Sequence, residues 1–312
     1  MGPEERQIGG AVPKQVLIFG PRERPQLEFI AKKPRKWARE GVTEAMLSTI
    51  GKTLPLSMAN FRLVRLPTAQ SEPDIRFMSE VFLKTGESLI HGVEIAGRFF
   101  EARPDEINRV FHLEDNRRER EFYTVDLVLE MLKALGRDDA ERKSLISGFG
   151  RMVAFDAFVG VQDRHAENWG VVECSLNPSQ PMKLSPIYDT ARGLFVSHGE
   201  DKLEEIDQSG DRQEQIQRYA EKSKPIFGCK CDGDVRTINH FRLIEHMVTE
   251  LGPYFGRPVR QLVGAIDLRR IEKQLQIKYA RIVTRRRMEF IALLLRYRHH
   301  RLRETVFHRS IS

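Results

Sequence analysis

The spacing of apolar positions predicts a β-rich first part of the chain. Runs of strand length, bounded by glycine, proline and polar residues, occur at residues 15–19, 26–31, 61–66 and 77–83. The first two flank the sequence GPRERP, which favours a turn, so they are expected to form a β-hairpin. Residues 44–52 have helical character, with Thr43 as a candidate N-cap. Up to residue 84 the pattern therefore indicates strands and one helix.

Beyond about residue 90 the apolar spacing changes to a helical period of about 3.6 residues. One helix is expected at residues 124–135, and a longer one after Asp138, which forms a candidate capping box with Glu141. This second helix is expected to end near Gly160. Short strands are then expected at residues 169–173 and before Tyr188, and mainly helices from residue 213 onward. The fold class that follows is α+β.

Composition is typical of a globular protein without a membrane span. Hydrophobic residues make up 40% and charged residues 30%, and the longest apolar run, residues 290–295, is far too short to cross a bilayer. The N-terminus lacks the apolar core of a signal peptide. We expect a cytoplasmic protein, or a secreted effector without a classical signal peptide. Cys229 and Cys231 lack a second pair at metal-ligand spacing, so a structural zinc site is not expected.

The positive charge of the chain is concentrated near its C-terminal end. The net charge is +7, from 51 basic and 44 acidic residues. Residues 281–309 contain nine arginines and only two glutamates, an excess equal to the charge of the whole chain. The arginines alternate with apolar Ile282, Phe290 and Leu294, which predicts an amphipathic helix with a solvated basic face. A docking surface for an acidic partner such as nucleic acid is the alternative interpretation.

The sequence DRHAEN contains side chains that phosphoryl transfer needs. That reaction requires a carboxylate near the acceptor hydroxyl and oxygen ligands for divalent cations. Asp163 and Asn168 have the interval of the Asp and Asn in a kinase catalytic loop, and Asp189 follows near the next strand as a second metal ligand. Each of these residues alone is typical of a turn or cap. Their combination and spacing indicate a phosphotransferase.

The two residues after Asp163 have other expected roles. Arg164 is expected to hold the loop in place through an ion pair. His165 is either a core histidine or a group that stabilises charge on the transferred phosphoryl group. On the second interpretation, His165 joins Asp163 as a catalytic residue.

In four segments the sequence resembles HipA-like serine/threonine kinases. The segments are FVGVQDRHAEN at residues 158–168, LSPIYD at 184–189, GGAVPK at 9–14 and FIAK at 29–32. The resemblance covers most of the chain and implies a bilobal, protein-kinase-like α+β fold. It places a small β-rich N-lobe at residues 1–84 and a larger, mainly helical C-lobe at residues 85–312.

The resemblance also implies how ATP and Mg²⁺ would be bound. Gly9, Gly10 and Lys14 would form the turn over the phosphates. Lys32 would neutralise the α- and β-phosphates as part of the catalytic set, held by Glu44 with Glu40 as the alternative. Adenine would contact the linker that contains Glu80 and Phe82. Magnesium would be held by Asn168 and Asp189.

The chain departs from the family pattern in two respects. Well-known members have an additional N-terminal subdomain before the glycine turn, whereas this chain starts almost at that turn, as expected of a minimal stand-alone kinase core. Some members phosphorylate a serine in the loop over the phosphates, yet residues 7–14 contain no serine or threonine. Regulation by that route is therefore not expected.

Two other functions remain open at this point. A phosphoinositide or small-molecule kinase would use a similar DRHxxN loop, and an inactive kinase-fold protein could bind nucleic acid through the basic tail. For a HipA-like kinase, the analogy suggests a toxin or effector that phosphorylates a translation factor or an aminoacyl-tRNA synthetase. It also suggests an antitoxin or other regulatory partner.

Overall fold

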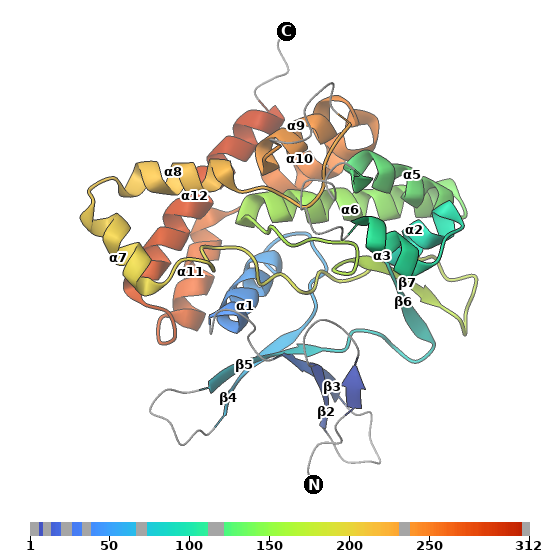
Figure 1. Cartoon of the computed structure of the whole chain (residues 1–312), viewed down its shortest axis with the longest axis horizontal. Helices are drawn as coiled ribbons and strands as arrows, with labels where there is room; N and C mark the ends of the chain where they lie inside the picture. The colour runs from blue at the N-terminus through green and yellow to red at the C-terminus, as the bar shows by residue number, and fades with distance from the viewer. Residues whose placement is uncertain are drawn as a thin grey trace.

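A five-stranded antiparallel sheet forms the N-lobe of the computed structural model, which describes residues 6–8, 14–19, 27–32, 39–66, 74–111, 122–230 and 238–307. The strands are β1 (Arg6–Ile8), β2 (Lys14–Phe19), β3 (Leu27–Lys32), β4 (Phe61–Leu66) and β5 (Asp74–Glu80), in the order β1-β2-β3-β5-β4. The expected hairpin is confirmed, because β2 and β3 pair with Lys14 opposite Lys32. The sheet projects below the helical lobe in Figure 1.

The N-lobe helix, α1 (Glu40–Gly51), begins earlier than its sequence predicted. The backbone N–H of Thr43 donates to Arg39 O at 2.9 Å, so Thr43 lies inside the first turn and is not the N-cap. Glu40 suits the first turn because its negative charge opposes the positive end of the helix dipole. The helix is buried over most of its length, and Thr49 Oγ1 lies 2.8 Å from Tyr279 Oη in the C-lobe. This contact links α1 to the larger lobe.

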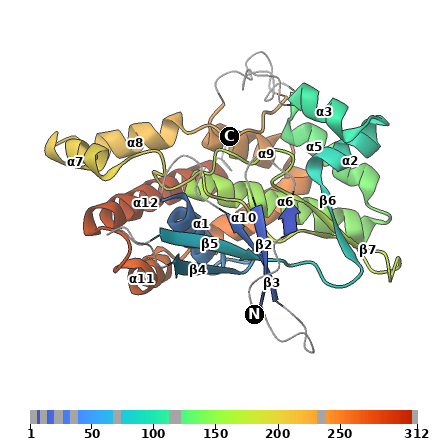
Figure 2. The ribbon, with the colours of Figure 1, turned by 60° about the horizontal axis from the view of Figure 1, so that its bottom comes forward.

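The C-lobe is built on a long central helix. It also contains a small antiparallel sheet of β6 (Glu87–His91), β7 (Gly170–Cys174) and β8 (Lys183–Leu184). Its helices are α2 (Gly92–Phe100), α3 (Pro104–Phe111), α5 (Val125–Leu135), α6 (Asp139–Val159), α7 (Glu200–Gln208), α8 (Arg212–Lys222), α9 (His240–Thr249), the π-helix η2 (Gly252–Gly256), α10 (Arg257–Gly264), α11 (Leu268–Tyr279) and α12 (Arg285–Phe307). Figures 1 and 2 both show α6 in the middle of this lobe. None of the helices in the described ranges is long and apolar enough to cross a membrane.

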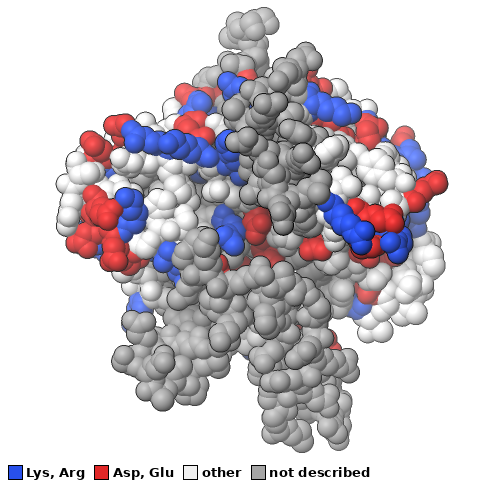
Figure 3. Space-filling model, in the orientation of Figure 1, with Lys and Arg blue, Asp and Glu red and all other residues white. Residues whose placement is uncertain are grey.

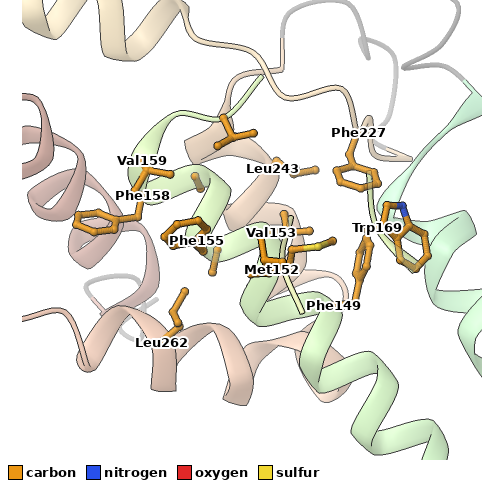
Figure 4. Packing of buried hydrophobic residues seen from close by; sticks show 14 of the residues in the cluster. Phe149, Met152, Val153, Phe155, Phe158, Val159, Trp169, Phe227, Leu243 and Leu262 are labelled. Carbon is orange, nitrogen blue, oxygen red and sulfur yellow. The ribbon is translucent and has the colours of Figure 1, made fainter. Parts of the chain in front are cut away.

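Helix α6 is buried because nearly all of its surface beyond the first turns is apolar. Phe149, Phe155 and Phe158 have no exposed surface, and Figure 4 shows these rings among side chains from other elements of the lobe. The Phe149 ring lies edge-on to Trp169, with ring centroids 5.0 Å apart. A helix that is apolar on all sides is stable only inside a core. The position at which the chain leaves α6 is therefore fixed by core packing.

Both ends of α6 are defined by specific residues. Asp138 accepts a hydrogen bond from Glu141 N at 2.8 Å, as expected of an N-cap. Glu141 does not complete a capping box; its carboxylate accepts from Arg137 N at 2.7 Å and from Met182 N at 2.6 Å. The buried carboxylate thereby fastens the connection between β7 and β8 to α6. At the other end Gly160 adopts φ 77°, which ends the helix where the sequence predicted.

The arginine-rich segment forms α12 as expected, and Arg285, Arg296 and Arg303 are solvated, but two other arginines of the helix are buried. Arg298 has no exposed surface and Arg287 is 7% exposed. Other arginines of the helix pair with glutamates of neighbouring elements, including Arg296 with Glu272 at 2.7 Å. The amphipathic pattern misses this arrangement because the acceptors of a buried guanidinium come from tertiary contacts, as Ala157 O and Ala220 O do for Arg298 Nε and Nη1. Part of the positive charge of this helix is therefore paired with groups of the protein itself.

We expect Glu141→Gln to lower the free energy of unfolding by about 2–3 kcal/mol near neutral pH. The hydrogen bond from Arg137 is the largest of the effects that lower the pKa of Glu141 from 4.5 to about 2. Since the pKa is lower in the folded state, the stabilisation is complete above pH 4.5 and is lost as the pH falls toward about 2.

Urea denaturation of both proteins between pH 7 and pH 2.5 measures this effect, with the difference between them shrinking as the pH falls. The exposed Glu130→Gln is the control, because its pair with Lys133 lies on a helix surface and contributes little. A constant difference at all pH values would contradict the role given to the Glu141 carboxylate.

Candidate active site

The loop between α6 and β7 is organised by one buried guanidinium. Arg164 is 1% exposed, and its Nε and Nη2 donate to Asp156 Oδ2 at 2.8 Å and Oδ1 at 2.9 Å. Its Nη1 donates to Asn168 O and to Tyr188 O, both at 2.8 Å. Arg164 therefore connects the last turns of α6, the end of the loop and the segment after β8. The ion pair that the sequence suggested for Arg164 is present.

The charge state of this pair is set by two opposing effects. Burial raises the pKa of Asp156, which favours the neutral acid. Burial would also lower the pKa of Arg164, but the nearby carboxylate outweighs it and the pKa of Arg164 is raised. Both carboxylate oxygens accept short hydrogen bonds from the same guanidinium, the geometry of an ionic pair. We conclude that Asp156 is a carboxylate and the counter-ion of Arg164.

Asp163 and Asn168 lie at the two ends of the loop and are joined by a hydrogen bond. Asn168 Nδ2 donates to Asp163 O at 2.7 Å, and Asn168 is 6% exposed. Because the amide nitrogen is used in this bond, the side-chain oxygen is the atom that can face a cation. The Asp163 side chain is 42% exposed and therefore accessible to an acceptor hydroxyl.

Asp189 follows a segment that bridges the lobes. Ile187 N donates to Ser57 O at 2.8 Å and Ala59 N donates to Ile187 O at 3.0 Å, so the chain after α1 is fastened to the residues before Asp189. Asp189 itself has φ 53°, a conformation that costs energy for a non-glycine residue and often occurs at functional sites. Because Arg164 Nη1 donates to both Tyr188 O and Asn168 O, the backbone directly before Asp189 lies close to Asn168.

Tyr188 connects the segment of Asp189 to the strands and the linker. Its hydroxyl donates to Glu167 O and lies near His91 Nδ1, both at 3.0 Å. Its ring lies 5.8 Å, centroid to centroid, from that of Phe82. Burial raises the pKa of Tyr188, so the phenol is neutral at physiological pH. Tyr188 thereby joins the candidate adenine-binding linker to the candidate metal segment.

The linker after β5 has some of its backbone donors already in use. Glu80 N donates to Asn60 O and Val81 N donates to Glu28 O, both at 2.8 Å. A nucleotide contact at Glu80 would therefore use its carbonyl oxygen. The strand ends at Glu80, three residues earlier than the sequence suggested, because the chain leaves the sheet to form the linker.

The expected phosphate-binding residues are only partly within the described structure. Gly9 and Gly10 lie outside the described residues. Lys14 and Lys32 are described as backbone positions in β2 and β3, where they are cross-strand partners. Lys32 also lies opposite Phe77 of β5. Glu44 is 4% exposed on α1. The roles given to these residues stay predictions.

Two further residues lie in or beside the loop of Asp163. Arg192 Nε lies 3.9 Å from Asp163 Oδ2, a partly exposed pair that the sequence analysis did not identify. Its only sequence signal is the proximity of an arginine to Asp189. His165 is half-buried, and its Nδ1 lies 3.4 Å from Glu167 N, too long for a strong hydrogen bond. The catalytic role of His165 stays a prediction.

The segment from residue 189 to 198 is held by α12. Asp189, Leu194 and Phe195 all have positive φ, with Leu194 at 47° and Phe195 at 61°. Arg287 donates to Phe195 O at 3.3 Å and to His198 O at 2.7 Å. These bonds hold a backbone that is unfavourable for bulky side chains.

Arg298, about three turns further along α12 on the same side of the helix, fixes the start of the same region. It donates to Ala157 O at 2.8 Å and to Ala220 O at 3.2 Å. These carbonyls belong to the last turns of α6 and α8, where backbone acceptors lack helical partners and the dipole is negative. One guanidinium thus caps two helices, and the α6 cap lies directly before the loop of Asp163.

The oxygen groups present suit magnesium. Asn168 and Asp189 provide an amide oxygen and a carboxylate, the ligand types that Mg²⁺ prefers alongside phosphate oxygens and water. Within the described ranges, no three histidine, cysteine, aspartate or glutamate side chains form a metal-binding group.

Comparison with known proteins gives one family and a shared fold. Residues 6–250 match the family of HipA-like C-terminal domains. The crystal structure of CtkA, a Helicobacter pylori proinflammatory kinase, superposes with a TM-score of 0.72 at 18% sequence identity, over 99% of this chain and 96% of that one. The FAT and kinase domain of CtTel1 superposes with a TM-score of 0.40 at 11% identity, over 97% of this chain and 22% of that one. No curated protein sequence matches this chain. The expected kinase-like α+β fold is confirmed.

We expect Asp156→Asn to lower the free energy of unfolding by about 3–5 kcal/mol, because it leaves the buried Arg164 without a counter-charge. Chemical denaturation measures the loss. Asp163→Asn makes the same chemical change at a partly exposed carboxylate in the same region and should alter stability by less than about 1 kcal/mol. Equal losses in the two variants would argue against the ion pair as the main support of the loop.

Proposed function

This chain belongs to the family of HipA-like C-terminal domains, and we propose that it is an ATP-dependent serine/threonine protein kinase. Family membership and the kinase-like fold support a kinase-type function. The observation that carries the finer proposal is the position of Arg164. Its contacts with Asn168 O and Tyr188 O keep the loop of Asp163 beside the segment of Asp189.

In the proposed reaction, Asp163 orients a serine or threonine hydroxyl of the substrate and accepts its proton. A bond forms between that oxygen and the γ-phosphorus of ATP as the bond to the β,γ-bridging oxygen breaks, and ADP leaves. Asn168 and Asp189 would hold Mg²⁺, which when bound would offset negative charge on the phosphates. Arg192, whose Nε lies 3.9 Å from Asp163 Oδ2, is the basic side chain beside the proposed proton acceptor.

The backbone of the loop is fixed before the substrate arrives. Asn168 Nδ2 is bonded to Asp163 O, and Arg164 is bonded to Asn168 O, so neither end of the loop has to be ordered on binding. Holding reacting groups in place in advance is a large part of the catalysis available to a phosphotransferase. A lysine at position 32 and a glutamate at 44 would complete the nucleotide site, as proposed from their places in β3 and α1.

The structure gives less support to the other two functions. The basic tail suggested nucleic-acid binding by an inactive protein, and attraction to anionic membranes for a lipid kinase with a similar DRHxxN loop, yet Arg287 and Arg298 are buried. Arg301 bonds to both Glu221 and Glu304. A phosphate backbone or anionic lipid surface would have to compete with these internal pairs.

We expect Asp163→Ala to reduce phosphoryl transfer at least about a thousandfold, because it removes the group that positions the hydroxyl and accepts its proton. Transfer of labelled phosphate from ATP to proteins of a cell lysate measures the effect. Asp105→Ala, which removes an exposed carboxylate from α3, is the control and should keep wild-type activity.

Retention of wild-type transfer by Asp163→Ala would remove Asp163 from the mechanism. Label that appears only in the lipid fraction would replace the protein-kinase proposal with the lipid-kinase one.

Asn168→Ala and Asp189→Ala should each raise the magnesium concentration needed for half-maximal transfer, by about tenfold or more. A magnesium titration at saturating ATP measures this, and it separates metal binding from a general loss of folded protein. Unchanged magnesium dependence in both variants would contradict their assignment as ligands.

A further inference from the structure

A pocket of about 320 Å³ lies beside the candidate active site, between the segment after Asp189 and helices α7 and α8. One wall is formed by Gln162, the residue directly before Asp163. The backbone N–H of Gln162 donates to Arg192 O at 3.2 Å. Phe195 forms another part of the lining. A group in this pocket would therefore lie next to the loop that is proposed to receive the acceptor hydroxyl.

The charged groups that line this pocket are all basic. Lys202, Arg218 and Lys222 contribute to the lining, and no aspartate or glutamate does so. Figure 3 shows basic side chains over α8, beside the acidic surface of α7. Single-signed charge in a concave site selects ligands of the opposite sign.

The basic side chains can exchange their present partners for a ligand. Lys202 pairs with Glu205 and Arg218 with Glu214, in each case on the same helix and with both groups substantially exposed. Pairs of this kind contribute little stability, so they can rearrange at low cost. Lys222, at the end of α8, has no carboxylate within 4.0 Å among the described residues.

The floor of the pocket is aromatic. The rings of Phe195 and Tyr219 are stacked with centroids 4.3 Å apart, and His198 lies edge-on to Tyr219 at 5.0 Å. Burial, followed by the charges of Lys202, Arg287 and Arg39, lowers the pKa of His198. His198 is therefore neutral at physiological pH and can take part in hydrogen bonds.

An aromatic floor with a cationic rim fits a side chain that has a short apolar stem and an anionic end. The pocket volume of about 320 Å³ is at the lower end of the roughly 300–1,000 Å³ of cavities that hold drug-sized ligands, so it has room for one such side chain. Phosphoryl and carboxylate groups share the chemistry that lysine and arginine recognise. Both occur on protein substrates close to a serine or threonine.

We propose that this pocket binds an anionic side chain of the protein substrate, an acidic or phosphorylated residue a few positions from the acceptor hydroxyl. The proposal rests on the kinase function proposed above and adds a substrate class to it. Lys222 would make the most direct contact, since it has no competing carboxylate among the described residues.

Matched peptides test this proposal. Each peptide carries one serine and, at a single flanking position, either glutamate, phosphoserine or glutamine. For wild-type protein, kcat/KM should be about tenfold higher with an anionic residue than with glutamine at one position, the effect of about one charged hydrogen bond. The comparison of glutamate with phosphoserine identifies the preferred anion. A ratio near one at every position would overturn the proposal.

Lys222→Glu should bring that ratio to one or below, and the milder Lys222→Gln should reduce it. Each protein is compared with itself on two peptides, so a partial loss of folded protein does not alter the ratio. Lys143→Gln, which removes an exposed lysine near the start of α6, should keep the wild-type ratio. An unchanged ratio in Lys222→Glu would overturn the assignment of Lys222.

Direct binding separates this inference from the kinase proposal. Fluorescence anisotropy of the labelled acidic peptide without ATP requires no transfer. Lys222-dependent binding of the acidic peptide without any phosphoryl transfer would support the proposed role of the pocket and contradict the kinase function. Phosphoryl transfer without a preference for anionic peptides would support the kinase function and contradict the proposed role of the pocket. Stronger Lys222-dependent competition by short single-stranded RNA or phosphatidylserine vesicles than by the acidic peptide would overturn the choice of a protein side chain.

Discussion

The ion pair between Arg164 and Asp156 is the interaction on which the candidate active site depends. The two segments that carry Asp163, Asn168 and Asp189 are loops, and their separation is set by side chains that bridge them, including Tyr188, whose hydroxyl donates to Glu167 O. Arg164 provides that separation because one planar group reaches a carboxylate and two backbone carbonyls at once. Burial makes the arrangement costly to disturb, since each donor that loses its partner has no water to replace it. The last turns of α6, through Asp156 and Arg164, therefore hold the loop of the candidate active site in place.

Helix α12 also holds the candidate active site in place, through two of its arginines. Arg287 holds backbone carbonyls in the segment after Asp189, and Arg298 caps α6 and α8. These two arginines lie on one helix and contact both ends of the stretch that contains the candidate catalytic loop and the candidate metal segment. The arginine-rich segment, whose charge predicted a solvated surface, thus also holds backbone segments of the candidate active site in place. It also leaves fewer arginines for an external acidic partner.

The sequence predicted the elements that are determined by local patterns of neighbouring residues. The β2–β3 hairpin, α5, α6 and its end at Gly160 follow from local patterns and cap residues, and the kinase-like fold followed from short motifs. It was wrong where tertiary contacts decide. Thr43 is a good N-cap by type, yet the helix begins at Glu40; Glu141 completes no capping box because Met182 and Arg137 compete for its carboxylate. The burial of Arg298 could not be foreseen, because its acceptors Ala157 and Ala220 are distant in the sequence.

The separation between Arg298 and Ala157 has a consequence for how this protein becomes functional during synthesis. The two residues are 141 positions apart, so a ribosome would release the entire candidate catalytic loop and candidate metal segment before the residue that caps α6 has been made. Until α12 emerges and docks, the last carbonyls of α6 lack that cap and the strained backbone near Phe195 lacks its bonds to Arg287. A nascent chain would therefore carry the candidate site residues in an unfixed arrangement. Order in the candidate active site would arise in a late step of folding, when α12 docks against α6.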